Sequence, residues 1–139
     1  MILLEPNFLL AYILVTIIGI YILNLPTVIT GETAIVREYY YKGWKTYLPI
    51  DLLLVFAYFL VAEAIWNAAG ITRTSGRLVV LTLVTIALTG GWCWWFTSRP
   101  QTGTFFSRWF HLVGWQAVLF DVVLLGLIYL LYASLPKMW

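Results

Sequence analysis

Three acidic residues interrupt apolar stretches of this sequence, and their carboxyl groups are the side chains best suited to chemistry there. Asp51, Glu63 and Asp121 each lie within a run of aliphatic and aromatic residues. An ionised carboxylate is costly to bury in apolar surroundings, so each acid needs a hydrogen-bonding partner, a proton or a cation. The acids therefore predict either hydrogen bonds that join elements of the structure or a site for a proton or cation.

The positions of the first two acids favour structural roles. Asp51 follows Pro49 closely, and we expect it in the first turn of a helix, where a carboxylate interacts favourably with the helix N-terminus. Glu63 precedes Asn67 by one helical turn. We interpret this pair as a source of interhelical hydrogen bonds, with Arg73 or Arg77 as a candidate partner of Glu63.

Asp121 is predicted to be the most deeply embedded acid, near the centre of the last apolar run. Its candidate partners are polar residues of other runs or of the same helix: Tyr58, Thr82, Thr85, Thr89 and Gln116. The three threonines share one helical face by their spacing, which we interpret as packing surface rather than an ion pathway.

Other reactive side chains give no sign of catalysis. His111 is the single histidine and Cys93 the single cysteine, so neither belongs to a metal-binding or disulfide pattern. Phosphate-binding, zinc-protease, haem-attachment and serine-hydrolase motifs do not occur. We therefore predict a non-enzymatic protein without catalytic residues, cofactor or metal site, in which Cys93 is a small buried residue.

Composition indicates the solvent in which these groups lie. Of the 139 residues, 63% are hydrophobic and only 10% are charged, with a mean hydropathy of +0.92. A soluble domain carries about a quarter charged residues, so this composition excludes a soluble enzyme or nucleic-acid-binding domain. The net charge of +2 is too small for a nucleic-acid footprint. The sequence predicts an integral membrane protein whose first partner is the lipid bilayer.

Four apolar runs are long enough to cross a bilayer, whose hydrocarbon core needs about 20 residues of helix. They cover about 7–25, 48–69, 78–96 and 110–135, and prolines or glycines lie near their ends. We predict an all-α, integral membrane four-helix bundle made of two hairpins. The chain 1–139 would form a single transmembrane domain with both termini on the same side.

The segment 27–47 is predicted to be an interfacial linker, because it mixes aliphatic, charged and aromatic residues. The linker and the loop after the third run carry five basic residues against three on the opposite side. This difference slightly favours a cytosolic position for the two longer loops.

Aromatic residues gather beside these same two loops. If the predicted topology holds, 14 of them lie on one face of the membrane, whereas an aromatic belt predicts similar rings on both faces. The imbalance indicates either an aromatic belt alone or a thick interfacial layer that also contacts another protein. The candidate interfacial contact residues are Tyr40, Trp44, Arg108, Trp109 and His111.

Two segments resemble a known group of proteins. The residues FFSRWFHxVG at 105–114, followed by Phe120-Asp121, and the residues LPID at 48–51 are similar to patterns in small membrane proteins of nucleocytoplasmic large DNA viruses. The resemblance covers about the last two-thirds of the chain. It implies a protein of the virion's internal membrane that lies beneath the capsid and contacts minor capsid proteins.

Two classes of function follow from these observations. The first is a structural or anchoring subunit of a larger assembly, viral or cellular, whose partners are other membrane or capsid proteins. The second is a small proton- or ion-conducting homo-oligomer that uses Asp121 and Glu63. The sequence leaves the source membrane open between a virion membrane and a host endomembrane.

Overall fold

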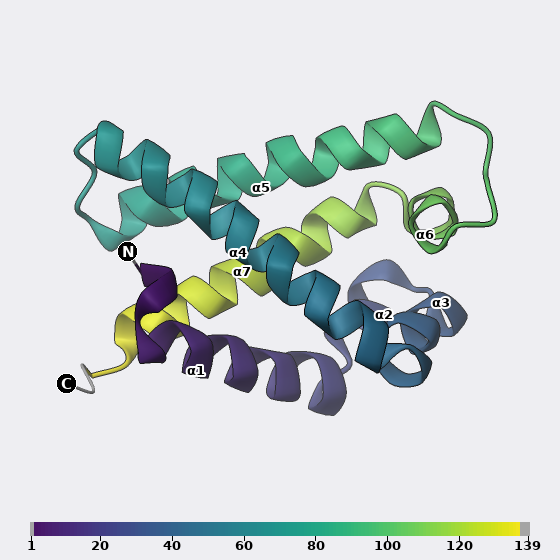
Figure 1. Ribbon diagram of the computed structural model, residues 1–139, viewed down its shortest axis with the longest axis horizontal. Coiled ribbons are helices and arrows are strands. Elements are labelled where there is room, and N and C mark those ends of the chain that lie inside the picture. The colour runs from purple at the N-terminus through teal and green to yellow at the C-terminus, as the bar shows by residue number, and fades with distance from the viewer. Residues whose placement is uncertain (1, 137–139) are drawn as a thin grey trace.

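The computed structural model describes residues 2–136, and every regular element within that range is a helix (Figure 1). The prediction of an all-α fold is therefore confirmed. The long elements are α1 (Pro6–Val15), which continues as the π-helix η2 (Thr16–Ile22), α4 (Trp44–Ala68), α5 (Thr74–Thr97) and α7 (Gln116–Ser134). The short ones are η1 (Ile2–Leu4), α2 (Leu25–Thr30), α3 (Thr33–Arg37), the π-helix η3 (Glu38–Lys42) and α6 (Phe105–Val113).

Three of the helices are long and apolar enough to cross a membrane. They are α4, α5 and α7, with 25, 24 and 19 residues and mean hydropathies of 2.1, 1.7 and 2.2 in their most apolar windows. Their outward faces carry large exposed apolar side chains such as Leu53, Leu83 and Leu119. Exposed apolar surface on this scale is unfavourable in water and favourable in lipid. The fold is therefore that of a helical membrane protein.

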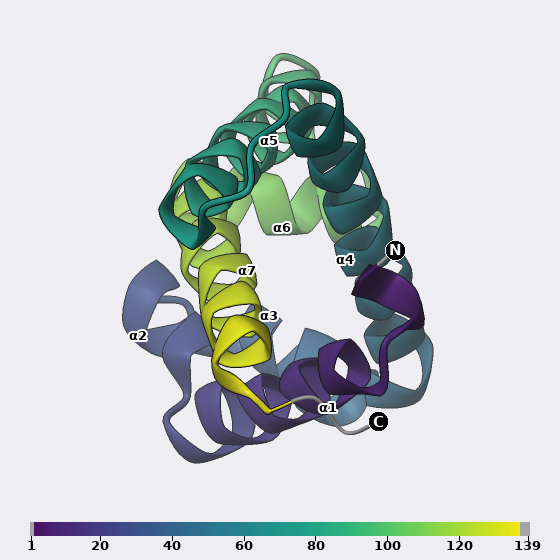
Figure 2. The ribbon, with the colours of Figure 1, turned by 90° about the vertical axis from the view of Figure 1, so that its left-hand side faces the viewer.

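The long helices alternate in direction and surround a common interior. α1 and α5 run one way along the molecule, whereas α4 and α7 run the other way (Figure 1). Viewed along the bundle, α1, α4, α5 and α7 form a ring, and α6 lies across its far end (Figure 2). This alternation brings α2, α3, η3 and α6 to one end of the molecule.

The two ends of the described chain lie together at the opposite end of the molecule (Figure 1). The Tyr132 hydroxyl donates a hydrogen bond to the Glu5 carboxylate at 2.8 Å. The Asn7 side-chain amide donates to the carbonyl of Pro136, also at 2.8 Å. These bonds join the start of α1 to the end of α7.

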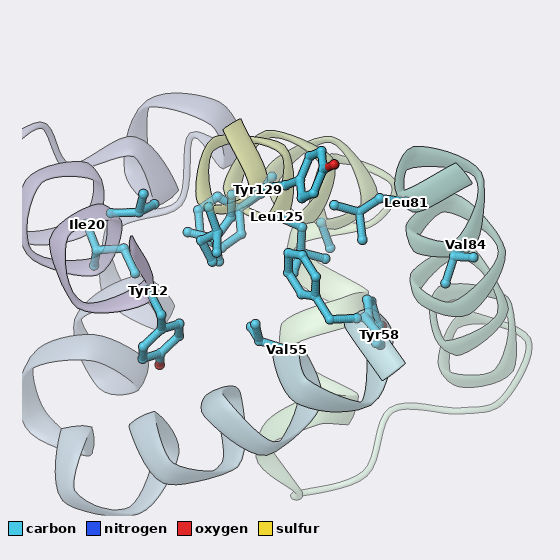
Figure 3. Packing of buried hydrophobic residues seen from close by; sticks show 14 of the residues in the cluster. Tyr12, Ile20, Val55, Tyr58, Leu81, Val84, Leu125 and Tyr129 are labelled. Atoms are coloured by element: carbon cyan, nitrogen blue, oxygen red, sulfur yellow. The ribbon is translucent and has the colours of Figure 1, made fainter. Parts of the chain in front are cut away.

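Aromatic and aliphatic side chains fill the interior of the bundle. Phe8 of α1 is fully buried, and its ring centroid lies 4.8 Å from that of Phe59 on α4 and 6.5 Å from that of Tyr132 on α7. Val55 and Leu125 are also buried and face the same interior from α4 and α7 (Figure 3). Cys93 is completely buried, as predicted.

The first apolar run ends earlier than the predicted boundary at residue 25. The helix formed by α1 and η2 stops at Ile22, and Asn24 adopts a left-handed conformation with φ of 54°. Among residues that have a side chain, asparagine is one of the few that tolerate this conformation. It can therefore terminate a helix. Leu25 and Pro26 then begin α2, because proline fits the first turn of a new helix.

The predicted linker 27–47 is mostly helical. It contains most of α2, all of α3 and η3, and the first turn of α4, which begins at Trp44 rather than at residue 48. Pro49 consequently lies inside α4 instead of at its start. Proline has no N–H to donate to the carbonyl of Lys45, one turn earlier in the helix. The loss of this hydrogen bond costs less stability because Lys45 is exposed.

The predicted fourth run, 110–135, is divided into two helices. Gly114 ends α6 with φ of 61° and ψ of −140°, a conformation essentially restricted to glycine. The chain turns there, and α7 begins at Gln116. Because α6 lies across the bundle, only α7 extends along it. The third predicted run, 78–96, lies within the longer α5.

Candidate functional site

A layer of aromatic residues closes the end of the bundle that lies opposite the chain ends. We call it the aromatic layer; it consists of α3, η3, the first turn of α4 and α6. Tyr39 of η3 is at its centre, stacked on Tyr47 with ring centroids 5.2 Å apart. The ring of Tyr39 also lies 5.2 Å from that of Phe105 and 5.7 Å from that of Trp109, both on α6. The two segments predicted to be separate loops thus form one packed unit.

An ion pair joins the same two segments at the surface of the layer. Arg108 of α6 donates two hydrogen bonds to the carboxylate of Glu38, at 2.6 and 2.8 Å. Both side chains are about one-third exposed, at 34% and 35%. The hydrogen bonds from Arg108 hold the pKa of Glu38 below its usual value. The two-bond geometry fixes the orientation of α6 against η3.

Close packing explains why residue 43, where η3 meets α4, is a glycine. A Cβ atom at this position would lie 2.5 Å from the ring of Tyr47 and 2.7 Å from the carbonyl oxygen of Glu38. The amide of Gly43 donates to that same carbonyl at 2.9 Å. Only glycine allows η3 and α4 to meet at this distance.

The predicted contact residues divide into core and surface. Tyr40 and Trp109 are 1% and 8% exposed, so they pack within the chain and are not surface contacts. Trp44 is 49% exposed and does belong to the surface. Arg108 is occupied by Glu38, and the ring nitrogens of His111 lie 2.7 and 3.0 Å from the carbonyl oxygens of Ser107 and Arg99. Burial of Tyr40 and Trp109 follows from the contact between two segments that are distant in the sequence.

Inside the bundle, beneath the aromatic layer, lies a cavity of about 280 Å³. Two acids from different helices line it, Asp51 of α4 and Asp121 of α7. Its other lining residues are hydroxyl-bearing, aliphatic or aromatic: Tyr39, Tyr40, Ile50, Leu54, Val55, Tyr58, Thr89, Trp92, Phe96, Phe106, Trp109, Phe110, Phe120, Leu124 and Leu125. The structure thus places two of the predicted polar residues at one site.

Asp51 is not the helix-capping acid that was predicted. Because α4 begins at Trp44, Asp51 lies in the third turn of the helix, and it is buried. The hydroxyl groups of Tyr39 and Tyr12 donate to its two carboxylate oxygens at 3.2 and 3.4 Å. Burial raises the pKa of Tyr39 well above its ordinary value, and the neighbouring charge of Asp51 raises it further.

Asp121 contacts one of its predicted partners directly and another indirectly. The Thr89 hydroxyl donates to the carboxylate of Asp121 at 2.6 Å, and Tyr58 lies within hydrogen-bond distance of Thr89 at 2.8 Å. This chain joins α4, α5 and α7. Asp121 is nevertheless not at the centre of its helix, because α7 begins only five residues before it.

Glu63 and Asn67 lie away from this cavity. Glu63 accepts hydrogen bonds from the backbone amide of Ile2 at 3.2 and 3.3 Å, at the end where the chain ends meet. Arg77, considered above as its partner, donates its Nε hydrogen to the carbonyl of Ile71. Asn67 is exposed near the end of α4. The structure therefore divides the predicted polar residues into two groups. Asp51 and Asp121 line the cavity, whereas Glu63 and Asn67 lie away from it.

Sequence reasoning did not find the partners of Asp51. Tyr12 precedes it by 39 residues, and Tyr39 is one of the aromatic residues that gather beside the predicted linker. No local spacing relates either tyrosine to the acid. The available signal was weaker: a buried acid without a nearby base needs hydroxyl donors, and tyrosine is frequent in this chain.

Searches of protein-family models, of curated proteins and of solved structures find no match to this chain. Within residues 2–136, no group of three or more histidine, cysteine or acidic side chains is arranged to hold a metal ion. Function must therefore be inferred from the aromatic layer and the cavity themselves.

Proposed function

We propose that this protein is a non-enzymatic, four-span membrane subunit that anchors a larger assembly to a bilayer. One observation carries the proposal: two segments far apart in the sequence, around Tyr39 and around Phe105, are joined into a single packed layer at one end. Interfacial loops that only follow the lipid surface do not require such packing. A rigid layer supplies a defined surface to which a partner protein can bind.

The outer surface of this layer has the character of a binding surface. Trp44, Tyr41 and Leu112 are 49%, 42% and 54% exposed, and the basic residues Lys42 and Lys45 are exposed beside them. Exposed aromatic and apolar side chains among charges are typical of protein interfaces. These residues, rather than the buried Tyr40 and Trp109, are the proposed contacts.

The fourth crossing in this proposal is the helix formed by α1 and η2. It contains 17 residues, the lower limit for a bilayer span, and is at most about 26 Å long, because its π-helical part rises less per residue than an α-helix. Slight thinning of the bilayer would accommodate this length. With four crossings, both chain ends and the α4–α5 turn lie on one side of the membrane, and the aromatic layer lies on the other.

The resemblance to membrane proteins of large DNA viruses indicates the kind of assembly. It favours a virion's internal membrane, with minor capsid proteins as the partners of the layer. An accessory subunit of a cellular membrane complex would use the same surface with a different partner.

Ion conduction through Asp121 and Glu63 has less support. Trp66 lies one turn from Glu63, and its ring contacts the ring of Tyr129, with centroids 5.7 Å apart. Tyr129 lies eight residues beyond Asp121 on α7, which corresponds to about 12 Å along the helix. The two acids are therefore at different depths. Proton flux in proteoliposomes that disappears in the Asp121→Asn variant would favour conduction over anchoring.

Site-specific photo-cross-linking in intact particles or native membranes tests the anchoring function. A photoreactive amino acid at Leu112 or Trp44 should form a cross-link to a second, different protein. The same group at Thr72, in the α4–α5 turn at the opposite end, is the matched control and should not form that product. Cross-links from Leu112 and Trp44 only to lipid, or the same product from Thr72, would refute the proposal.

A further inference from the structure

We propose that the cavity beneath the aromatic layer binds a small organic cation, namely a protonated amine attached to an apolar body. This inference goes beyond the anchoring function and does not depend on it. It rests on the charge of the cavity, the chemistry of its walls and the position of its mouth.

The charge of the cavity is unbalanced. Asp51 and Asp121 both line it, whereas no lysine, arginine or histidine does. The hydrogen bonds that these carboxylates accept come from neutral hydroxyl groups, those of Tyr12, Tyr39 and Thr89. Hydroxyl donors orient a carboxylate but do not neutralise it, so a cation in the cavity would offset the cost of holding two acids among apolar walls.

The remaining walls favour an organic cation over a metal ion. Nine of the lining residues carry aromatic rings, and five are aliphatic: Ile50, Leu54, Val55, Leu124 and Leu125. The remaining uncharged residue is Thr89. Calcium and magnesium sites are built mainly from several carboxylate and carbonyl oxygens, whereas only two acids line this cavity, and within residues 2–136 no group of three or more acidic, histidine or cysteine side chains is arranged to hold a metal ion. Aromatic faces attract ammonium groups and also bury apolar carbon.

The mouth of the cavity lies between two membrane-length helices. Tyr58 of α4 and Thr89 of α5 are in contact, and the cavity extends from there toward the aromatic layer. The lining residues Leu54 and Trp92 are 36% and 48% exposed, so they form the accessible edge. Both are apolar and belong to the spanning helices. A ligand would therefore enter from the lipid, which requires an apolar body beside its charge.

Equilibrium binding to the purified full chain tests this inference. The protein is placed in nanodiscs of neutral phosphatidylcholine, and the probe is radiolabelled 2-phenylethylamine, which is protonated at pH 7.4. We expect saturable binding that empty nanodiscs lack. Unlabelled 2-phenylethanol, its neutral analogue of similar size, should compete at least tenfold less well, and so should the phenylacetate anion.

Isosteric variants locate the bound amine. Asp51→Asn and Asp121→Asn retain side chains that accept hydrogen bonds from the hydroxyl groups, and each should raise the Kd at least tenfold. Glu63→Gln removes an acid outside the cavity and should leave the Kd within twofold. Helical circular dichroism and monodisperse elution confirm the fold of each variant.

Three results would overturn the inference: no saturable binding by the wild-type protein, equal competition by the alcohol, or unchanged affinity in both folded asparagine variants. If neither asparagine variant folds, the comparison of amine, alcohol and anion on the wild-type protein decides the question alone.

Discussion

Thr89 joins two side chains from different helices through one hydroxyl group. It donates to Asp121 at 2.6 Å, and the hydroxyl of Tyr58 lies 2.8 Å away. Thr89 is 1% exposed, so water does not replace these bonds when the hydroxyl is removed. At the residue scale, therefore, this threonine has a larger effect on stability than its size suggests.

We expect Thr89→Val to lower the free energy of unfolding by roughly 1 to 3 kcal/mol, because it leaves buried polar groups without partners while preserving side-chain shape. Unfolding by sodium dodecyl sulfate in mixed micelles measures the change. Thr82→Val, on the same helix but half-buried, is the control and should change stability by less than about 0.5 kcal/mol. Equal effects of the two substitutions would argue against the role of this hydrogen-bond chain.

Asp51 is held by two tyrosine hydroxyls rather than by a base. Tyr39 and Tyr12 donate to opposite oxygens of its carboxylate, one from η3 and the other from α1. The acid thereby connects the aromatic layer to the first helix. This connection accounts for an acid in the third turn of an apolar helix, where capping cannot explain it.

At the scale of elements, the corner between α6 and α7 depends on the backbone of Gly114. A Cβ atom there would meet no atom within 4 Å, so crowding is not the obstacle. The obstacle is the conformation itself, which residues with a side chain rarely adopt.

Gly114→Ala should therefore destabilise the fold by about 1 to 3 kcal/mol through backbone strain alone. Gly91→Ala is a matched control, since a Cβ at this helical position also meets nothing within 4 Å. That substitution should be neutral or stabilise the protein by up to about 1 kcal/mol. Thermal unfolding in detergent compares the two variants; equal loss in both would contradict the assigned strain.

The ion pair between η3 and α6 gives the aromatic layer a predictable response to pH. The pKa of Glu38 is lower in the folded protein than its usual value of about 4.3, because Arg108 donates hydrogen bonds to it. Its contribution to stability is therefore complete above the usual pKa and is lost as the pH falls through the lowered value.

We expect amide hydrogen exchange in 38–43 and 105–113 to accelerate when the pH falls below about 4, after correction for the intrinsic rate. Arg108→Gln should produce this acceleration already at neutral pH. Arg37→Gln removes an exposed arginine beside Glu38 and should have little effect. Protection that is the same in wild type and Arg108→Gln at pH 7 would refute the role of the pair.

At the scale of the whole molecule, the antiparallel order of the long helices determines which distant segments of the chain come into contact. It places α2, α3, η3 and α6 together at one end and the two ends of the described chain at the other (Figure 1). The aromatic layer and the cavity beneath it exist only because of this order.

Single-cysteine labelling with a membrane-impermeant maleimide tests the proposed topology. In a Cys93→Ala background, cysteines at Leu4 and Thr72 should react from one side of sealed vesicles, and cysteines at Thr33 and Thr102 from the other. Four crossings require this alternation, and lysed vesicles serve as the control for reactivity. Labelling of Leu4 and Thr33 from the same side would mean that α1 and η2 do not cross.

The sequence was sufficient for properties that depend on composition and local pattern. It predicted the helical class, the apolar helices α4 and α5 within a few residues and the burial of Cys93, because hydropathy and helix length are local quantities. It also named Thr89 among the candidate partners of Asp121. Boundaries set by single residues were missed, since Asn24 and Gly114 act through a backbone conformation that tertiary contacts select.

Only the tertiary structure decided which distant side chains meet. It brought Tyr12 and Tyr39 to Asp51, buried Tyr40 and Trp109 that were predicted as contacts, and moved Glu63 away from Asp121 to the amide of Ile2. The physical reason is that a carboxylate in an apolar interior accepts whichever donor the packing of helices brings within reach, and sequence spacing does not encode that packing.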